Sequence, residues 1–273
     1  METLKGTRLA QGSTADIHAW GDDKVLKLFH PGFSSEYVQY EHNLNCKAME
    51  TGLPVPKVYQ LLEQEGRQGI VFERIDGPLM LEWMFVRADQ VEDLARAFAD
   101  AHAQIHRTRV SGFPGLHEPL ANVIESTKWI DDEQREDVLG ILRALPGGDT
   151  LIHGDFHPGN VVISDRGAIV LDWLTARQGD PHADVANTVM ILRHAGVPGD
   201  DPAVIEQINA LRSAFLCAYQ RRYLELRPDT SWEQVERWMI PLILGRLTLD
   251  NEDERESLLR ELESLLIKYA PSV

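Results

Sequence analysis

The chain has 273 residues, of which 43% are hydrophobic and 26% charged, and its formal net charge is −16. Such a length allows one large domain or two smaller lobes, and the composition is typical of a globular protein. The negative charge disfavours nucleic acid and anionic membranes as partners, because both attract positive surfaces. It is compatible with a cationic small substrate, and equally with an acidic surface that only aids solubility.

The sequence also argues against a membrane or secreted protein. Its apolar runs fall far short of the roughly 20 residues that span a bilayer. Its first residues, METLKGTRLAQG, contain no apolar signal core. The two cysteines, Cys46 and Cys217, form no CxxC pair and show no metal-ligand spacing. We therefore expect a cytoplasmic protein with reduced thiols.

The first part of the chain is rich in strand signals. Residues 5–30 alternate short apolar stretches with Gly and Asp turns, which predicts an antiparallel sheet. Residues 34–51 predict a helix with a serine N-cap and a glycine just past its end. Residues 53–75 predict two further strands around a Glu-Gly-Arg turn, and the Gly77-Pro78 dipeptide then breaks the pattern.

The remainder of the chain reads mainly as helix, with one strand-like interruption over residues 150–172. Apolar residues at helical spacing mark the segments 88–107, 120–144, 202–226, 231–247 and 253–269. We therefore predict an α+β fold, with a small β-rich lobe over residues 1–76 and a larger helical lobe over residues 77–273. In this interpretation a short hairpin is inserted in the second lobe.

The most informative stretch is residues 151–163, LIHGDFHPGNVVI, in which a dense polar centre lies between apolar flanks. Asp155 and Asn160 come just before a predicted strand, and Asp172 follows the second strand of the same hairpin. Because a hairpin brings its ends together, these three side chains should converge at its open end. Two carboxylates and an amide oxygen suit Mg²⁺ and a phosphate better than Zn²⁺.

The sequence HGDFHPGN at residues 153–160, followed by LDW at residues 171–173, resembles motifs of the aminoglycoside phosphotransferase and choline kinase family. This family is a branch of the protein-kinase-like fold, and the resemblance covers most of the chain. It implies a bilobal fold with Asp155 as the catalytic base. It further implies Asn160 and Asp172 as Mg²⁺ ligands and His153 as a structural residue.

A kinase-like fold also needs a phosphate-covering loop, a lysine on the strand after it and a carboxylate on the next helix. Ser13 and Thr14, in a turn with a single glycine, offer hydroxyl and backbone N–H groups to phosphates. Lys27 matches the family's nucleotide-phosphate lysine. We assign Glu41 as its partner, with Glu36 as the reserve.

Two further segments resemble parts of the family. Residues 71–77 resemble the hinge between lobes, where main-chain groups near Glu73 and Ile75 would read the adenine ring. The sequence GDPHADVA at residues 179–186 predicts a capped helix start. Within it, Asp184 is expected to support the backbone of the catalytic loop.

The resemblance implies a kinase of small molecules. Asp172 and Asp184 are only twelve positions apart, which leaves no room for the long activation segment of a protein kinase. We expect an ATP-dependent O-phosphotransferase, with GTP as the alternative nucleotide and an aminoglycoside-like acceptor. Choline, fructosamine, macrolide and other metabolite kinases remain alternatives. The acidic run at residues 250–263 either lines a pocket for a cationic acceptor or is a solvated helix face.

Two interpretations of a different class stay open. One is a regulatory pseudokinase that binds a nucleotide without phosphoryl transfer, although no motif residue is lost. The other is a metal hydrolase built on His153, Asp155 and His157. The pair His102 and His106 is spaced as on one helix face, but no glutamate follows His102, so the HExxH pattern is not met and a packing role is favoured.

Overall fold

The computed structural model describes residues 6–197 and 201–269. These residues form two compact units. The first unit contains the chain up to residue 80 together with residues 159–175, and the second contains residues 81–158 together with the chain from residue 176 onward.

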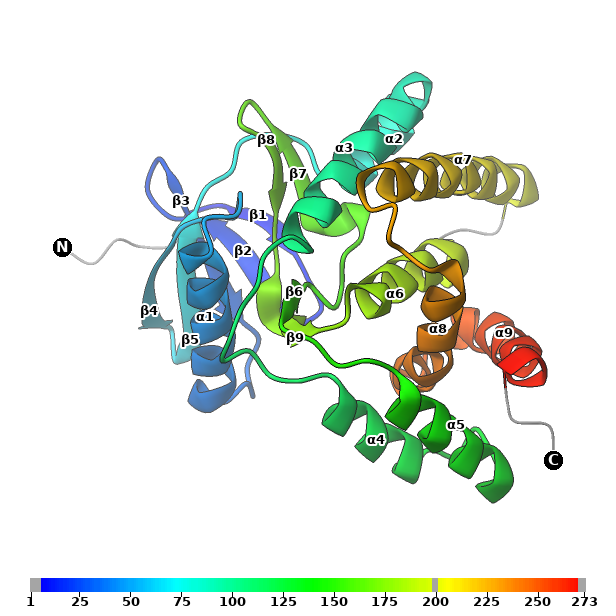
Figure 1. Cartoon of the computed structure of the whole chain (residues 1–273). Helices are drawn as coiled ribbons and strands as arrows, with labels where there is room; N and C mark the ends of the chain where they lie inside the picture. Colours follow the sequence, from blue (N-terminus) through cyan, green and yellow to red (C-terminus); the bar gives the residue numbers. More distant parts are fainter. Residues whose placement is uncertain (1–5, 198–200, 270–273) are drawn as a thin grey trace. The chain divides into compact units, whose positions relative to one another are not determined.

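The first unit is built on a five-stranded antiparallel sheet (Figure 1). Its strands, in spatial order, are β1 (Arg8–Gln11), β2 (Ala15–Ala19), β3 (Lys24–Phe29), β5 (Arg67–Glu73) and β4 (Val58–Gln64). Period-2 alternation divides the buried side chains between two clusters. Phe29 and Ile70 belong to one cluster, and Leu26 and Val71 belong to the other.

The helix α1 (Ser35–Glu50) packs against this sheet, next to β4 and β5 (Figure 1). It begins where the sequence predicts, because the Ser34 hydroxyl accepts a hydrogen bond from the backbone N–H of Tyr37 and so caps the first turn. It ends before Gly52, which has a positive φ of 78°. Cap chemistry visible in the sequence therefore sets both ends of this helix.

The hairpin of β7 (Val161–Ser164) and β8 (Gly167–Val170) belongs to the first unit. The Pro78 carbonyl accepts a hydrogen bond from the Ile163 N–H (3.0 Å). A Cβ at Gly77 would lie 2.1 Å from the Ile163 carbonyl oxygen, so only glycine permits this close approach. The compact unit thus includes a hairpin that the sequence interpretation placed in the second lobe; the functional division at residues 76–77 stays a prediction.

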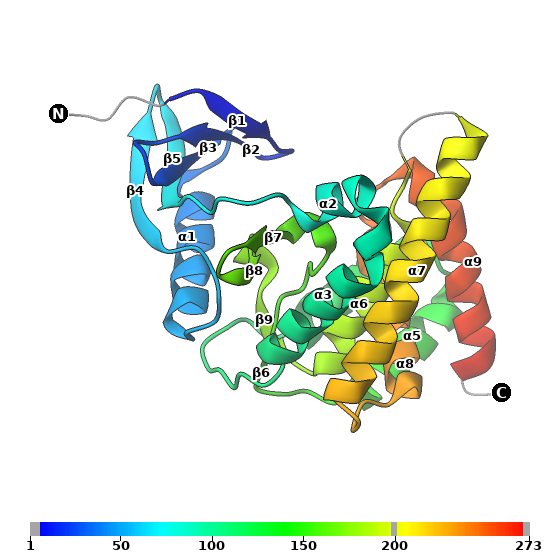
Figure 2. The same ribbon diagram turned by 90° about the horizontal axis from the view of Figure 1, so that it is seen from above.

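The second unit is mainly helical (Figure 2). Its helices are α2 (Met80–Val86), α3 (Val91–Ile105), α4 (His117–Ser126), α5 (Asp132–Ala144), α6 (Pro181–His194), α7 (Pro202–Leu226), α8 (Trp232–Leu247) and α9 (Glu252–Tyr269), with a short 3₁₀ turn at 88–90. Of two further 3₁₀ turns, the one at 158–160 has its first residue in the second unit and the rest in the first, and the one at 173–175 belongs to the first unit. In both views α3 and α7 lie side by side (Figures 1 and 2). A two-stranded antiparallel pair, β6 (Thr150–Ile152) with β9 (Arg177–Gly179), lies beside α6.

The α+β prediction is confirmed, but the single helix predicted over residues 120–144 is wrong. Two helices, α4 and α5, occupy this region. The backbone becomes extended at Thr127, and Asp131 then starts α5 with a capping box to Gln134. The helical spacing of apolar residues continues across the break and hides it. The short elements α2 and β9 were not predicted.

No helix within residues 6–197 and 201–269 combines the length and apolarity needed to cross a bilayer.

Candidate active site

In the first unit the structure brings Lys27, Glu41 and Asp172 together. The Lys27 ammonium, on the third strand of the sheet, donates to Glu41 Oε1 on α1 (2.6 Å) and lies 3.6 Å from Asp172 Oδ1. Glu41 is 1% exposed, whereas Glu36 faces solvent in the first turn of the same helix. Glu41, and not the reserve residue Glu36, therefore makes the contact.

This arrangement keeps Lys27 charged. Burial by itself lowers the pKa of a lysine, but the carboxylates of Asp172 and Glu41 outweigh burial here and raise the pKa of Lys27. Glu41 is fully enclosed, while the Asp172 side chain is 44% exposed. The Asp172 carboxylate therefore stays accessible from solvent, while that of Glu41 is committed to Lys27.

Asn160 and Asp172 flank the same end of the β7–β8 hairpin. Asn160 ends the 3₁₀ turn Pro158–Asn160, and its carbonyl accepts a hydrogen bond from the Leu171 N–H (2.8 Å). Asp172 then has a left-handed backbone, with φ of 58°. An exposed carboxylate and an amide are hard oxygen donors of the kind that Mg²⁺ binds, and the donor chemistry at this hairpin end therefore fits Mg²⁺.

Ser13 and Thr14 lie in the turn between β1 and β2, where Ser13 is exposed. The Gly12 N–H donates to the Ala15 carbonyl (2.9 Å) and closes the turn. His30 holds the turn from outside, because its N–H donates to the Thr14 carbonyl (2.8 Å) and its Nε2 lies 3.1 Å from the Gly12 carbonyl. Sequence reasoning missed His30, whose contacts depend on the pairing of β2 with β3.

Glu73 and Ile75 lie at and just after the end of β5. The Glu73 carboxylate accepts from the Lys57 N–H (3.1 Å) and pairs with Arg166 of the hairpin (3.2 Å). Its side chain is therefore engaged within the first unit. Ile75 is half-buried beyond the strand. That main-chain groups near these two residues bind the adenine ring stays a prediction.

In the second unit, β6 leads into the loop of residues 153–158. The His153 side chain is completely buried, and its Nδ1 accepts from the Asp155 N–H (3.3 Å). Asp155 is half-exposed, and its Oδ2 lies 3.6 Å from His157 Nε2. Burial raises the pKa of Asp155, but the nearby His157, His153 and Arg246 outweigh it and leave the pKa below its usual value. Asp155 is therefore ionised at neutral pH.

One face of α6 holds the backbone of this loop. Asp184 accepts from the N–H of His153 through Oδ2 (2.6 Å) and from the N–H of Gly154 through Oδ1 (2.8 Å). Two more side chains, about one helical turn after Asp184, bind carbonyls of the loop. Asn187 donates to the carbonyl of Gly154 (2.7 Å), and Thr188 donates to that of Phe156 (2.9 Å). Asn187 and Thr188 were not predicted from the sequence, although their spacing after Asp184 on a predicted helix was a usable signal.

The predicted site residues are thus distributed over both units. Lys27, Glu41, Asn160 and Asp172 belong to the first unit, and His153, Asp155 and Asp184 belong to the second. Convergence of Asp155 with the metal-ligand pair stays a prediction.

The metal-hydrolase alternative required His153, Asp155 and His157 to lie at ligand spacing. In the part of the chain that the structure describes, the group of three that does so is a different one, His102, His106 and Asp184, and all three are buried. His153 Nδ1 is instead engaged by the backbone of its own loop.

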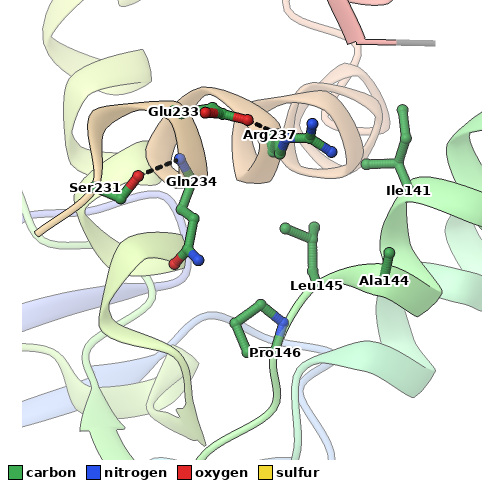
Figure 3. A pocket seen from close by; sticks show the side chains of 8 residues that line it. All are labelled: Ile141, Ala144, Leu145, Pro146, Ser231, Glu233, Gln234 and Arg237. Carbon is green, nitrogen blue, oxygen red and sulfur yellow. Dashed lines mark hydrogen bonds and ion pairs between the residues drawn. The ribbon is translucent and has the colours of Figure 1, made fainter. Parts of the chain in front are cut away.

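A surface pocket of about 290 Å³ lies elsewhere in the second unit, between α5 and α8 (Figure 3). Leu145 and Pro146 line one side of it, and Gln234 and Arg237 line the other (Figure 3). The Arg237 guanidinium is paired with Glu233 (3.1 Å). None of the predicted site residues lines this pocket.

Comparison with known proteins gives a family and a fold. A model of the phosphotransferase enzyme family matches residues 6–228. The uncharacterized protein YcbJ of Bacillus subtilis (strain 168) is 37% identical over 59 residues, a stretch that covers 21% of this chain and 16% of that protein. The chain therefore matches about one sixth of the length of this curated relative.

Two solved structures resemble nearly the whole chain. A thermostable mutant of aminoglycoside phosphotransferase APH(4)-Ia, in complex with AMP-PNP and hygromycin B, is 16% identical with a TM-score of 0.69, covering 97% of this chain and 94% of that one. A putative fructosamine-3-kinase from Haemophilus somnus 129PT is 14% identical with a TM-score of 0.63, covering 97% and 92%. These similarities confirm the kinase-like fold that the sequence predicts.

Proposed function

The chain belongs to the phosphotransferase enzyme family, and on this premise we propose that it transfers the γ-phosphate of ATP to a hydroxyl group of a small molecule. The observation that carries the proposal is the half-buried Lys27, held charged between Glu41 and Asp172. A fixed cation at this place binds phosphate oxygens, and its partner Glu41 orients it.

The first unit supplies the nucleotide side of the proposed site. Ser13 and Thr14 face the phosphates from the turn that His30 holds. Asn160 and Asp172 would hold Mg²⁺, which neutralises phosphate charge when bound. Main-chain groups near Glu73 and Ile75 would bind the adenine ring, and GTP is the alternative nucleotide.

The second unit supplies the acceptor side. Asp155 orients the acceptor hydroxyl and accepts its proton, a role that needs a carboxylate ionised at working pH. The lowered pKa of Asp155 meets this need. Hydrogen bonds from His153 and Gly154 to Asp184 hold the loop that carries Asp155. Holding the loop in place contributes to catalysis, because a general base acts only when it lies within hydrogen-bond reach of the proton that it accepts.

The acceptor class is proposed from the likeness to known kinases. Similar structures include aminoglycoside phosphotransferases and a putative fructosamine-3-kinase, and one of them carries hygromycin B. Nucleotides in such structures include AMP-PNP and GDP. An aminoglycoside-like compound is therefore the first candidate, followed by fructosamine-type and choline-type alcohols.

The acidic run does not distinguish among these acceptors. Several of its carboxylates are already paired: Asp250 with Arg255 (2.9 Å), Glu254 with Arg246 (2.9 Å) and Glu261 with Arg193 (2.6 Å). These pairs weaken the case that the run binds a cationic acceptor, because their charges are largely compensated within the second unit.

A panel assay tests the proposal. The full chain is incubated with Mg²⁺ and either ATP or GTP, together with aminoglycosides, choline-like alcohols, fructosamines and macrolides in turn. Release of nucleoside diphosphate is measured, and mass spectrometry follows the acceptor. We expect one class to gain a phosphoryl group at a hydroxyl. Tight nucleotide binding without transfer to any class would overturn the proposal in favour of a regulatory nucleotide-binding protein.

A further inference from the structure

Behind the loop of residues 153–158, four buried side chains form two matched pairs. His102 lies in the last turn of α3 and His106, four positions later, is the C-cap of that helix, while Tyr219 and Tyr223 are one turn apart on α7. The two helices lie side by side (Figures 1 and 2). The Tyr219 hydroxyl lies 2.8 Å from His102 Nδ1, and the Tyr223 hydroxyl lies 2.6 Å from His106 Nδ1.

Both histidines turn their other ring nitrogen toward one carboxylate. The Nε2 atoms of His102 and His106 each lie 3.2 Å from Asp184 Oδ2. His106 makes a hydrogen bond there, whereas the His102 contact lacks hydrogen-bond geometry. All of these side chains are at most 3% exposed. Asp184 Oδ2 also accepts the backbone N–H of His153, and Oδ1 of the same carboxylate accepts the N–H of Gly154.

The protonation states follow from burial. Burial, together with the neighbouring His106, lowers the pKa of His102 to about 3, and burial likewise lowers the pKa of His106. Burial raises the pKa of both tyrosine hydroxyls. At neutral pH both imidazoles are therefore uncharged, both hydroxyls keep their proton, and Asp184 is an anion that can only accept.

A neutral imidazole has one donor and one acceptor nitrogen, and each of these rings faces a carboxylate with one nitrogen and a hydroxyl with the other. The nitrogen that faces Asp184 carries the proton, because a carboxylate oxygen 3.2 Å away accepts an N–H from His106 and would repel a lone pair in either ring. Nδ1 then accepts, and the tyrosine hydroxyl donates. Asp184 thus selects the tautomer of each histidine, and each tyrosine hydroxyl supports that tautomer by donating to Nδ1.

We propose that His102, His106, Tyr219 and Tyr223 are positioning residues, which orient Asp184 through tyrosine-supported histidine tautomers and so hold the backbone of the loop that carries Asp155. The kinetic meaning of this arrangement rests on the proposed function, since a displaced Asp155 lowers kcat and leaves nucleotide binding in the first unit unchanged. The chain of contacts itself does not depend on the identity of the acceptor.

A bound metal ion is the competing explanation for the same three groups. His102, His106 and Asp184 offer one ligand atom each within a single small cluster. Structural zinc sites have four protein ligands, and the cluster found among residues 6–197 and 201–269 supplies three. A metal would also require the opposite tautomer, with the proton on Nδ1 and an Nε2 lone pair toward the ion. The tautomer therefore decides between the two explanations.

The first test measures the tautomers directly. Nitrogen chemical shifts of the histidine rings are recorded on the full chain without added ligand, and His102→Gln and His106→Gln identify the two signals. We expect both rings to be neutral with the proton on Nε2, and we expect metal analysis to find no stoichiometric ion. The proton on Nδ1, or one bound zinc for each chain, would overturn the proposal.

The second test removes the hydroxyl that donates to His106 Nδ1. Tyr223→Phe keeps the ring and deletes the donor, so the His106 signal should shift toward a mixture of tautomers. Hydrogen exchange at the N–H groups of His153 and Gly154 should become about fivefold faster, as expected from loss of one buried hydrogen bond of roughly 1 kcal/mol. Tyr59→Phe is the matched control, because Tyr59 is exposed on β4; it should change neither reading.

The outcomes separate this inference from the proposed function. An unchanged His106 tautomer in Tyr223→Phe, or loop exchange that rises only in step with global unfolding, would show that the tyrosine merely packs. Neither reading needs an acceptor or a nucleotide. A chain that phosphorylates no compound can therefore still show the proposed histidine tautomers and their effect on the loop, and an active kinase can still lack them.

Discussion

Asp172 illustrates how a single residue at the hairpin end links backbone conformation to charge. Its left-handed backbone, with φ of 58°, follows directly on the Leu171 N–H that closes the hairpin, and its carboxylate lies 3.6 Å from the Lys27 ammonium. Aspartate and asparagine both tolerate this backbone region. Replacing one by the other therefore tests the charge of the side chain without disturbing the turn.

Asp172→Asn should lower phosphoryl transfer steeply, and excess Mg²⁺ should restore little of it, because the ion loses a charged ligand. The measurement is the rate of nucleoside diphosphate release as Mg²⁺ is titrated. Asp165→Asn, an exposed change at the hairpin turn, is the control and should behave like the parent. An unchanged Mg²⁺ dependence in Asp172→Asn would remove this residue from the metal site.

At the residue scale, the sequence was most informative where contacts are local. Asp155, Asn160 and Asp172 lie within one short stretch around a hairpin. The choice between Glu41 and Glu36 needed the structure, because it depends on which face of α1 meets the sheet. Tyr219 and Tyr223 were beyond reach, since each contacts a histidine 117 positions away.

At the scale of elements, α3, α6 and α7 share a buried polar cluster that makes stability depend on pH. The folded pKa of His102 is about 3, far below the roughly 6.5 of an exposed histidine. A depressed pKa stabilises the fold at pH values above the unfolded pKa, and this stability is lost as pH falls toward the folded pKa. The affected window therefore lies below about pH 6.5.

The free energy of unfolding should consequently fall by about 2 kcal/mol for such a histidine between about pH 7 and about pH 5. Urea unfolding at both pH values measures this change. His102→Gln removes one titrating group, so its stability should fall less over the same interval than that of the parent chain. Equal losses in the two proteins would mean that His102 is protonated in the folded state.

Element boundaries were predictable where caps are explicit. Ser34 and Asp180 start their helices as expected, with side chains that accept from the first-turn backbone. The break between α4 and α5 was missed because apolar spacing runs through it, although the capping box of Asp131 and Gln134 was visible in the sequence. The pairing of β6 with β9 was not predictable, because no local sequence pattern connects these two segments.

At the scale of the whole molecule, the net charge of −16 favours a cationic acceptor only if some carboxylates remain uncompensated near it. Glu254 is not one of these, because it is 3% exposed and forms a bidentate pair with Arg246. Glu252 and Asp253, on the same helix start, are exposed. The acidic run therefore contains a buried, paired carboxylate as well as exposed carboxylates.

Rising ionic strength should raise the KM of a cationic acceptor more than that of MgATP, because salt screens long-range attraction. If Glu252 and Asp253 contribute to this attraction, Glu252→Gln with Asp253→Asn should raise the same KM. Glu254→Gln should instead destabilise the fold, by up to the roughly 3–5 kcal/mol typical of a broken buried pair. A neutral acceptor with a salt-independent KM would refute the electrostatic argument.

The overall fold followed from the sequence because the strand-rich and helix-rich halves differ so clearly in texture. The membership of the hairpin in the first compact unit did not, because it depends on tertiary contacts such as that of Gly77 with Ile163. The meeting of Asp155 with the Lys27, Asn160 and Asp172 group is the step on which the proposed chemistry depends.

The measurement that tests this step most directly is single-turnover transfer of the γ-phosphate to an acceptor by the parent chain and by Asp155→Asn, with nucleotide affinity measured on the same samples. We expect Asp155→Asn to bind nucleotide normally and to transfer phosphate about 10²–10⁴-fold more slowly, the usual contribution of a general base. Transfer by Asp155→Asn at the rate of the parent chain would contradict the proposed mechanism.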